Sequence, residues 1–378
     1  MESKSEAPAL DWIQAGHLLK QLQLGTQGVY QLVAQPAKPD SPRADARDQS
    51  QLRHLLKDAL DAMHDLRERI NAAFLTEDRA NSNQPVFDEL EEAAHHVRQV
   101  VTQIRETAGV DVPDIKALVQ QRREAVDEEV NEVARLAESS AHHSGQPVIP
   151  SATATRLCEL IRAIRDREQQ QEFHAQLLRT QQEVIESSGE PYSLENFAYG
   201  STPFSTWMQL LGQEVVADTI NSMRHEYCET SPRFFTVFGS SSGSLVLFTA
   251  LAWGIPAEGV EILPFLHAEA ERFRERAGLS PVQCGFTCAP MLSASLARTR
   301  VLVLTSQCWD APLYARVLRK VDHELPDDAL VLDYKKGLQH SARFKLLARL
   351  DAQKVSWTTA QPLFVFGHGQ AGIEDLHM

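Results

Sequence analysis

A glycine-rich turn follows the first predicted strand of this chain, and an acid lies at the end of the second. The apolar run FFTVF at 234–238 leads into GSSSG at 239–243, which is followed by an apolar helical segment. Open parallel sheets bind ligands at this carboxyl edge, where glycines let the backbone approach a nucleotide cofactor. Glu261, about twenty residues further on, is placed to accept hydrogen bonds from ribose hydroxyls. We therefore expect a cofactor site that includes Gly239, Ser240, Gly243 and Glu261.

The same five letters spell G-x-S-x-G, the turn that exposes a nucleophilic serine in α/β-hydrolases. Ser241 would be the nucleophile, with Asp333 or Asp351 and then His368 following in the chain order of such enzymes. Hydrolases of this kind place several strands before the serine, whereas everything before Phe234 has a helical pattern. A serine hydrolase using Ser241 is therefore the third of three hypotheses.

The chain before Pro191 is predicted to be helical and acidic. Apolar residues recur at intervals of three and four over 52–74, 90–104, 115–133, 157–164 and 177–185, which predicts five amphipathic helices. Of the net charge of −14, about −11 lies before Pro191. We predict an acidic helical bundle over 1–188 that selects partners or substrates, and a second domain over 189–378. A stripe exposed on the bundle would allow homo-oligomers.

The second domain has the pattern of an α/β fold. We predict a helix that begins at Ser201-Thr202-Pro203, where a hydroxyl would cap it, and continues to Ile220. Helical stretches at 245–253, 267–277, 292–297 and 313–324 alternate with the first five of seven strand-like runs, which makes those strands parallel. The last two runs are joined around Gln361-Pro362 and must pair as an antiparallel hairpin. The seven runs are 234–238, 259–263, 283–288, 300–306, 329–334, 354–358 and 363–367.

This order of five parallel strands, an acidic end to the second strand and a terminal hairpin resembles the class I S-adenosylmethionine-dependent methyltransferases over roughly Tyr192 to Gly367. The segment NFAYGST at 196–202 resembles the cofactor-covering loop of the non-SET, disruptor-of-telomeric-silencing type histone lysine methyltransferases. The fold class implied is a Rossmann-like seven-stranded methyltransferase sheet. The resemblance further implies S-adenosylmethionine as cofactor, with Tyr199, Gly200 and Thr202 covering its methionine end, Gly239 and Gly243 shaping the turn beneath it, and Glu261 holding the ribose.

Several positions depart from the family pattern. Val237 stands where an acid usually introduces the turn, Ser241 replaces the middle glycine, and no acid follows the third strand to bind the adenine amine. The sequence SQCWD at 306–310 stands in place of the Asn-Asn-Phe run of the lysine methyltransferases. There, Gln307 could orient a methyl acceptor and Trp309 could stabilise a cationic centre over its ring, or Trp309 could simply fill the core.

These observations favour methyl transfer to a protein side chain, with a non-catalytic interaction protein of the same fold as the second hypothesis. A basic protein substrate suits the acidic chain, whereas a nucleic-acid groove is not indicated: the basic residues over 316–349 read as exposed faces of two amphipathic helices.

Scattered cysteines, no signal segment and no apolar run of about 18 residues predict an intracellular protein, cytoplasmic or nuclear, without a membrane span. No metal site is expected, because Cys284 and Cys288 lack a second pair of ligands.

Overall fold

The computed structural model describes residues 115–138, 147–226 and 232–369, and the chain falls into two compact units. One unit comprises residues 1–120 and 170–176, and the other comprises 121–169 and 177–378. The helices predicted at 52–74 and 90–104, and with them most of the predicted bundle, lie outside the described residues. The second unit contains the sheet and every residue of the site discussed below.

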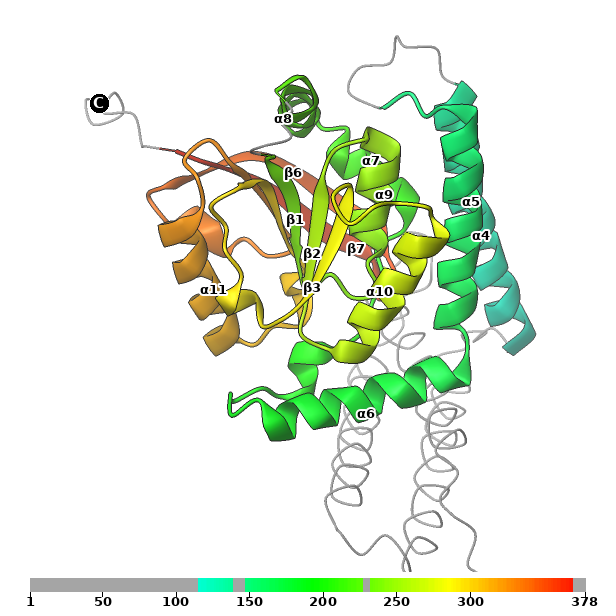
Figure 1. Cartoon of the computed structure of the whole chain (residues 1–378), viewed down its shortest axis with the longest axis horizontal. Helices are drawn as coiled ribbons and strands as arrows, with labels where there is room; N and C mark the ends of the chain where they lie inside the picture. The colour runs from blue at the N-terminus through cyan, green and yellow to red at the C-terminus, as the bar shows by residue number, and fades with distance from the viewer. Residues whose placement is uncertain (1–114, 139–146, 227–231, 370–378) are drawn as a thin grey trace, which may run out of the picture. The chain divides into compact units, whose positions relative to one another are not determined.

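A seven-stranded mixed sheet forms the centre of the second unit (Figure 1), with the strand order β3-β2-β1-β4-β5-β7-β6. The first five strands in the chain run parallel, while β7 pairs antiparallel with both β5 and β6. This is the seven-stranded α/β sheet with a terminal antiparallel hairpin that the sequence predicted. The strands are β1 Phe234–Phe238, β2 Ala257–Glu261, β3 Cys284–Cys288, β4 Thr299–Leu304, β5 Leu330–Asp333, β6 Phe344–Val355 and β7 Thr358–His368.

Both faces of the sheet are buried, which explains why its central strands read as continuous apolar runs. Along β4, Val301 and Val303 belong to one buried cluster while Leu302 and Leu304 belong to another. The first cluster includes α9 and α10 residues and the second includes α11 residues, so helices cover the sheet on both sides (Figure 1). The helices are α4 Ile115–Glu138, α5 Ser151–Glu168, α6 Gln171–Ser187, α7 Phe204–Leu211, α8 Glu214–His225, α9 Ser244–Trp253, α10 Pro264–Arg276 and α11 Ala311–Glu324.

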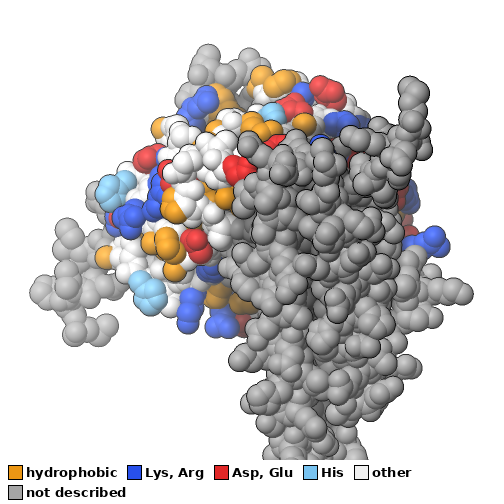
Figure 2. Space-filling model, turned by 90° about the horizontal axis from the view of Figure 1, so that it is seen from below, with side chains coloured by type: hydrophobic (Ala, Val, Ile, Leu, Met, Phe, Trp, Pro, Cys, Tyr) orange, Lys and Arg blue, Asp and Glu red, His pale blue; other side chains and the backbone are white. Residues whose placement is uncertain are grey.

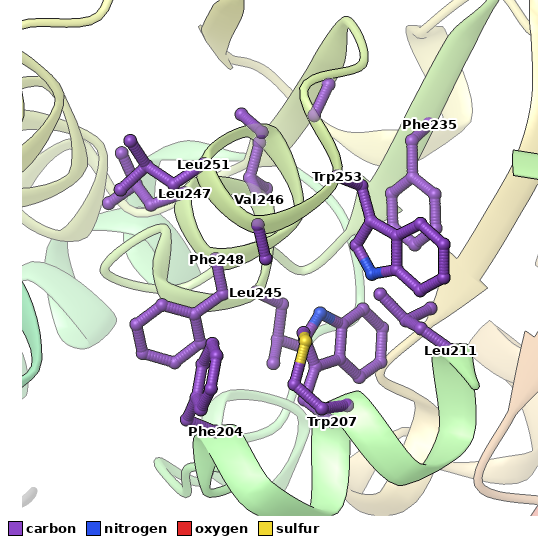
Figure 3. Close-up of a cluster of buried hydrophobic side chains, with 14 of the residues drawn as sticks. Phe204, Trp207, Leu211, Phe235, Leu245, Val246, Leu247, Phe248, Leu251 and Trp253 are labelled. Carbon is purple, nitrogen blue, oxygen red and sulfur yellow. The ribbon is translucent and has the colours of Figure 1, made fainter. Parts of the chain in front are cut away.

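Helix α9, which follows the glycine-rich turn, is buried all round. Its ten residues are all buried, and α7 packs against it through an edge-to-face contact between the rings of Phe204 and Phe248 (Figure 3). The indole nitrogen of Trp207 donates to the Thr249 hydroxyl at 3.0 Å, so the polar edge of this buried ring is satisfied. The turn at the start of α9 is therefore anchored by a fully buried helix.

Two predicted helices differ from the observed structure. The helix expected from Ser201 to Ile220 is two helices, because α7 ends at Leu211 with Gly212 as its C-cap and α8 begins at Glu214. No side chain caps α7 at Pro203, and the Thr202 hydroxyl bonds instead to Tyr334, so the predicted hydroxyl cap was wrong. The helix predicted at 292–297 is only the short 3-10 turn η2, Met291–Ser293.

The terminal hairpin was predicted correctly in direction but not in position. Its turn lies at Ser356-Trp357 rather than at Gln361-Pro362, and its first strand begins at Phe344. Lys345 and Arg349 therefore lie on a strand, where the sequence predicted an amphipathic helix. Strands β6 and β7 are longer than the first five strands, and most side chains of β6 are exposed. The apolar pattern that identifies a buried strand is therefore missing from most of β6.

Helix α5 belongs to the unit that contains the sheet, which therefore extends further toward the N-terminus than the boundary predicted at 188/189. Leu157, Ile161 and Ile164 of α5 lie in the same buried cluster as α9 residues. Within the described part of the chain, no helix combines the length and apolar character needed to cross a lipid bilayer.

Candidate functional site

The turn after β1 lies at the carboxyl edge of the sheet and is bonded mainly to β2. The backbone N–H groups of Gly239 and Ser240 both donate to the carbonyl of Val260, at 2.9 and 3.1 Å. The N–H of Gly243 donates to the carbonyl of Ser240 at 2.9 Å, which closes the turn at the start of α9. These amides, which the sequence suggested for cofactor contacts, are thus already bonded within the protein.

Gly239 and Gly243 are required by both backbone conformation and space. Their φ angles are 70° and 83°, in the left-handed region that favours glycine. A Cβ atom at Gly239 would lie 2.5 Å from the Thr305 hydroxyl oxygen, and one at Gly243 would lie 2.6 Å from the ring of Phe286. The turn therefore packs against Thr305 at the end of β4 and against Phe286 in the middle of β3, with no room for a larger residue.

Glu261 ends β2 and bonds directly to the turn. Its Oε2 atom accepts from the backbone N–H of Ser241 at 2.7 Å, and its Oε1 atom accepts from that of Leu263 at 3.0 Å. The residue is only 6% exposed. Burial raises the pKa of this carboxyl, while the backbone hydrogen bonds oppose the rise. Each oxygen retains acceptor capacity for a further donor, such as a ribose hydroxyl.

Three buried polar atoms in this region have no hydrogen-bond partner: the hydroxyls of Ser240 and Ser241 in the turn, and the amide nitrogen of Asn196, whose carbonyl accepts from Cys308 after β4. Ser240 packs over Gly259 of β2, so its hydroxyl belongs to the base of the turn. Ser241 adopts a φ of 56°, a left-handed conformation that is strained for a residue with a side chain. Buried polar groups are normally satisfied, so such atoms beside a carboxyl-edge turn are candidates for contacts with a bound polar ligand.

The segment predicted to cover the cofactor does lie next to the turn. The hydroxyl of Tyr199 donates to Glu168 at the end of α5 at 2.7 Å and lies 3.4 Å from the hydroxyl of Ser242. Desolvation, with the neighbouring Glu168 carboxylate, raises the pKa of Tyr199 well above its usual range, so this hydroxyl remains protonated. Tyr199 is therefore fixed as a donor between α5 and the turn.

Gly200 and Thr202 serve mainly to dock this segment on the sheet. A Cβ atom at Gly200 would lie 2.5 Å from the ring of Trp357 in the β6–β7 turn. The hydroxyl of Thr202 lies 2.5 Å from that of Tyr334, and the residue is 3% exposed. Gly200 thus holds the segment 199–203 against the β6–β7 turn, and Thr202 holds it against Tyr334, directly after β5.

The two residues predicted to act on the methyl acceptor follow β4 but are placed differently from each other. Gln307 is exposed within the 3-10 turn η3, Ser306–Cys308. Trp309 is 4% exposed and belongs to the buried cluster that contains Phe238 and Leu313. The ring therefore occupies the core, as in the packing alternative considered from the sequence. Cys308 donates to the carbonyl of Asn196, and burial raises the pKa of its thiol to about 11.

A second buried acid, Asp333, lies at the end of β5 beside η3. It accepts hydrogen bonds from the hydroxyl of Ser306 at 2.5 Å, from that of Tyr314 at 2.6 Å and from the backbone of Lys335 at 3.0 Å. Burial raises its pKa to about 6, although these donors oppose the rise. Asp333 thus fixes the position of η3 relative to β5 and α11.

A cavity of about 490 Å³ opens next to the end of β2. One wall comes from the residues after β2 and β3, namely Ile262, Pro290 and Leu292. The remaining lining residues are Val184, Ser187, Ser188, Glu190, Tyr192, Ser293 and Arg316. Because Ile262 directly follows Glu261, the cavity lies where the base of a nucleoside held by that acid would extend. The wall formed by Ile262, Pro290 and Leu292 is apolar and suits one face of a flat ring, whereas the rest of the lining is mainly polar and includes the ion pair between Glu190 and Arg316.

The hydrolase hypothesis does not agree with the strand register. His368 ends β7, where Gly367 pairs with Leu330 at the beginning of β5, so this histidine lies at the amino edge of the sheet. Ser241 lies at the opposite, carboxyl edge. The Nδ1 atom of His368 is 2.9 Å from the carbonyl of Pro326, and its ring stacks on Phe344. The histidine therefore cannot activate Ser241 as a general base, which requires hydrogen-bond contact.

Sequence reasoning missed Glu168 and the apolar wall of the cavity. Glu168 is one acid among many on a helix face, and only the fold brings it to Tyr199. Ile262 and Pro290 are found by counting one and two residues beyond the ends of β2 and β3, which requires accurate strand boundaries. Among the described residues, no three His, Cys, Asp or Glu side chains are grouped so as to hold a metal ion.

The described surface shows no single charged groove in the view of Figure 2. Lys and Arg side chains are scattered there among acidic and apolar ones over the part of the face that is coloured.

No protein-family model matches the chain. No curated protein sequence matches it either. Among solved structures, it is similar to an RNA methyltransferase from Salinibacter ruber in complex with S-adenosyl-L-homocysteine, at 17% identity over 44% of this chain and 97% of that chain, with a TM-score of 0.32. A ribosomal protein L11 methylase from Lactobacillus delbrueckii subsp. bulgaricus gives 12% identity over 42% and 80% of the two chains, with a TM-score of 0.30. A mutant of the protein MtNAS in complex with S-adenosylmethionine gives 12% identity over 69% and 93%, with a TM-score of 0.35.

Proposed function

We propose that the chain is an S-adenosylmethionine-dependent methyltransferase that acts on an amine, of the kind found in a lysine side chain of a basic protein. The observation that carries the proposal is the carboxyl-edge site itself. A left-handed turn, a buried acid at the end of β2 and a cavity with one apolar wall next to that acid lie side by side.

The residues of the site fit S-adenosylmethionine in chemistry. Glu261 would bind the ribose hydroxyls, Ile262 and Leu292 would enclose the adenine, and the unpartnered polar atoms of Ser241 and Asn196 would bind the methionine end. Backbone amides contribute less than in a glycine-only turn, because those of Gly239, Ser240 and Ser241 are bonded within the protein. When bound, the cofactor supplies an electrophilic methyl group carried on a sulfonium sulfur.

The protein residues beside the turn would prepare the acceptor. An amine attacks a methyl group only in its neutral form, and the reaction needs mainly that this amine is held in line with the methyl group. Tyr199, whose hydroxyl is held by Glu168 and lies 3.4 Å from the hydroxyl of Ser242, would help to position the acceptor beside the turn. Gln307, exposed after β4, is placed to contact an entering chain.

The second candidate is an interaction protein that keeps the fold without catalysis. It is favoured by Ser241, whose side chain occupies a position that suits glycine, and by the turn amides that are already bonded. Both features reduce what the turn offers to a cofactor. A direct binding measurement separates the two candidates.

The deciding experiment is calorimetric titration of the full chain with S-adenosylmethionine and S-adenosylhomocysteine. We expect micromolar binding in the wild type, a loss of at least tenfold in Glu261→Gln and little change in Glu258→Gln. Glu258 is a matched control because it lies on the same strand and bonds to the Thr236 hydroxyl instead of the turn. The absence of binding to either ligand by folded protein would exclude the methyltransferase and leave the interaction protein.

The acceptor is tested separately with radiolabelled S-adenosylmethionine. Transfer of label to poly-L-lysine, and not to fully succinylated poly-L-lysine, is the result expected for an amine acceptor. Cofactor binding without such transfer would reject the lysine-type amine while keeping the cofactor site.

A further inference from the structure

An arginine buried between two carboxylates lies directly behind Tyr199. Arg165 of α5 is 8% exposed, and it donates from Nε and Nη2 to Glu129 of α4 at 2.8 and 3.0 Å. Its third nitrogen, Nη1, donates to both oxygens of Glu168, at 2.9 and 3.2 Å. One planar guanidinium therefore sets the orientation of two acids on different helices. Of these, Glu168 accepts the hydrogen bond of Tyr199.

Glu129 has a second contact that reaches the same loop segment from its other end. Its Oε2 atom accepts from the backbone N–H of Phe204 at 2.6 Å, at the first residue of α7. Glu129 is 3% exposed. A carboxylate at the N-terminus of a helix accepts from a free backbone amide and interacts favourably with the helix dipole. Glu129 therefore accepts a hydrogen bond at the start of α7, where the sequence predicted a hydroxyl cap.

The segment 199–203 is consequently held at both ends by one connected set of bonds. Tyr199 is bonded to Glu168, Phe204 is bonded to Glu129, and Arg165 joins the two carboxylates. Desolvating a guanidinium and two carboxylates is costly, and apolar residues of similar size often stabilise a core as well or better. General stability therefore gives little reason for this arrangement, whereas fixing the Tyr199 hydroxyl beside Ser242 gives a specific one.

We propose that Arg165 and Glu129 are positioning residues, which hold Glu168 and Tyr199 in their places beside the turn for the methyl-transfer reaction. The inference rests on the proposed function for its catalytic meaning, but the geometry it describes belongs to the protein without cofactor. Helices α4 and α5 then supply part of the site, where the sequence suggested a separate module for selecting partners.

Arg165→Lys tests the proposal, because lysine keeps the buried positive charge but cannot bond both carboxylates with a planar fork. Arg167→Lys is the matched control. Arg167 is two residues further along α5, is 9% exposed and bonds a carboxylate through Nε and Nη2 in the same way, but that carboxylate is Glu269 of α10. Both changes introduce the same chemistry on the same helix, and only the first touches the partner of Tyr199.

The first readout is the ¹⁹F NMR resonance of the full chain labelled with fluorotyrosine, with Tyr199→Phe to assign the signal. Arg165→Lys should shift this resonance, because Glu168 is then no longer held by the guanidinium fork and its hydrogen bond from the Tyr199 hydroxyl changes. Arg167→Lys should leave the resonance unchanged. An unchanged signal in Arg165→Lys, or equal changes in the two variants, would overturn the positioning role. If Arg165→Lys does not fold, Glu129→Gln takes its place, since it keeps the shape of the side chain.

The second readout is transfer to poly-L-lysine. We expect kcat to fall at least tenfold in Arg165→Lys and less than threefold in Arg167→Lys, with KM for S-adenosylmethionine unchanged in both. Equal losses would mean that the two arginines only support the fold. A wild-type protein without transfer would count against the proposed function, while the NMR result would still decide whether Arg165 positions Tyr199.

Discussion

The carboxylate of Glu261 accepts a hydrogen bond from the backbone amide of Ser241 at 2.7 Å and so connects β2 to the turn after β1. The turn and the acid are therefore one unit: the acid that would bind a ribose also fixes the strained residue beside it. This connection makes the protonation state of Glu261 matter for both the shape of the turn and the binding of ligand.

Binding of S-adenosylhomocysteine should weaken as the solution becomes more acidic. Burial raises the pKa of Glu261, so protonation begins at a higher pH than for an exposed glutamate and removes acceptor capacity. We expect Kd to rise at least threefold between pH 7 and pH 5 in the wild type. In Glu261→Gln, Kd should be higher than in the wild type and nearly independent of pH. Calorimetry across this range decides, and a parallel pH dependence in both proteins would assign the effect to another group.

Protonation of Asp333 should raise the free energy of unfolding in mild acid. Burial raises the pKa of this carboxyl from 3.8 to about 6, so the folded state binds the proton more tightly than the unfolded state. The stabilisation is fully present below pH 4 and is lost as the pH rises to about 6. At about 1.4 kcal/mol per pH unit, the difference amounts to at most about 3 kcal/mol.

Denaturant unfolding of the wild type and Asp333→Asn between pH 4 and pH 7 measures this contribution. The free energy of unfolding should lose part of its pH dependence over this interval in the variant. Glu258→Gln is a useful comparison, because burial raises the pKa of that carboxyl also. Identical slopes in the wild type and Asp333→Asn would show that Asp333 titrates as an ordinary acid.

Gly239→Ala should destabilise the fold more than Gly254→Ala. Both glycines have positive φ angles, of 70° and 64°, so alanine is strained at either position by about 1 kcal/mol. At Gly239 the added Cβ atom also meets the Thr305 hydroxyl, whereas nothing lies within 4 Å at Gly254. We expect a loss of about 1 kcal/mol at Gly254 and 2 kcal/mol or more at Gly239. Urea midpoints with equal m-values provide the comparison, and equal losses would mean that Thr305 moves aside freely.

Ser241→Gly should separate stability from binding. Glycine relieves the left-handed strain and is expected to raise the free energy of unfolding by about 0.5–1 kcal/mol. Removing the unpartnered hydroxyl should at the same time weaken binding of S-adenosylmethionine several-fold. Ala352→Gly, at a φ of 52° on β6, should give the stability gain alone. A stabilised Ser241→Gly protein that binds as tightly as the wild type would show that the hydroxyl makes no ligand contact.

The sequence was sufficient to predict the sheet where burial produces simple patterns. The runs at β1, β4 and β5 are buried on both faces, so most of their side chains are apolar and mark the strands. The glycines of the turn were found because they follow β1, and Glu261 because it ends the next strand, β2. The edge strand β6 was predicted only in its last residues, since its many exposed side chains resemble a polar helix face.

Contacts between distant residues were not predictable in this way. Glu168 lies 31 residues before Tyr199, and Glu129 lies 75 residues before Phe204. Neither pair has a local pattern, since the bonds depend on how α4 and α5 pack beside the sheet. The core position of Trp309 likewise depends on packing against α11. The sequence alone was therefore compatible with either a buried ring or a ring that contacts the acceptor.

The bonds made by α5 also have a consequence for biosynthesis. Arg167 pairs with Glu269, which is 102 residues further along the chain, so the helix leaves the ribosome long before its partner is made. Until α10 emerges, the Arg167 guanidinium must remain in water or with other groups, because an unpaired buried charge is too costly. The same separation means that a recombinant fragment starting at residue 189 would leave Glu269 without Arg167, and Tyr199 without Glu168. Expression of the sheet by itself should therefore give a product prone to aggregation, whereas co-expression with a peptide that spans 121–169 should restore solubility.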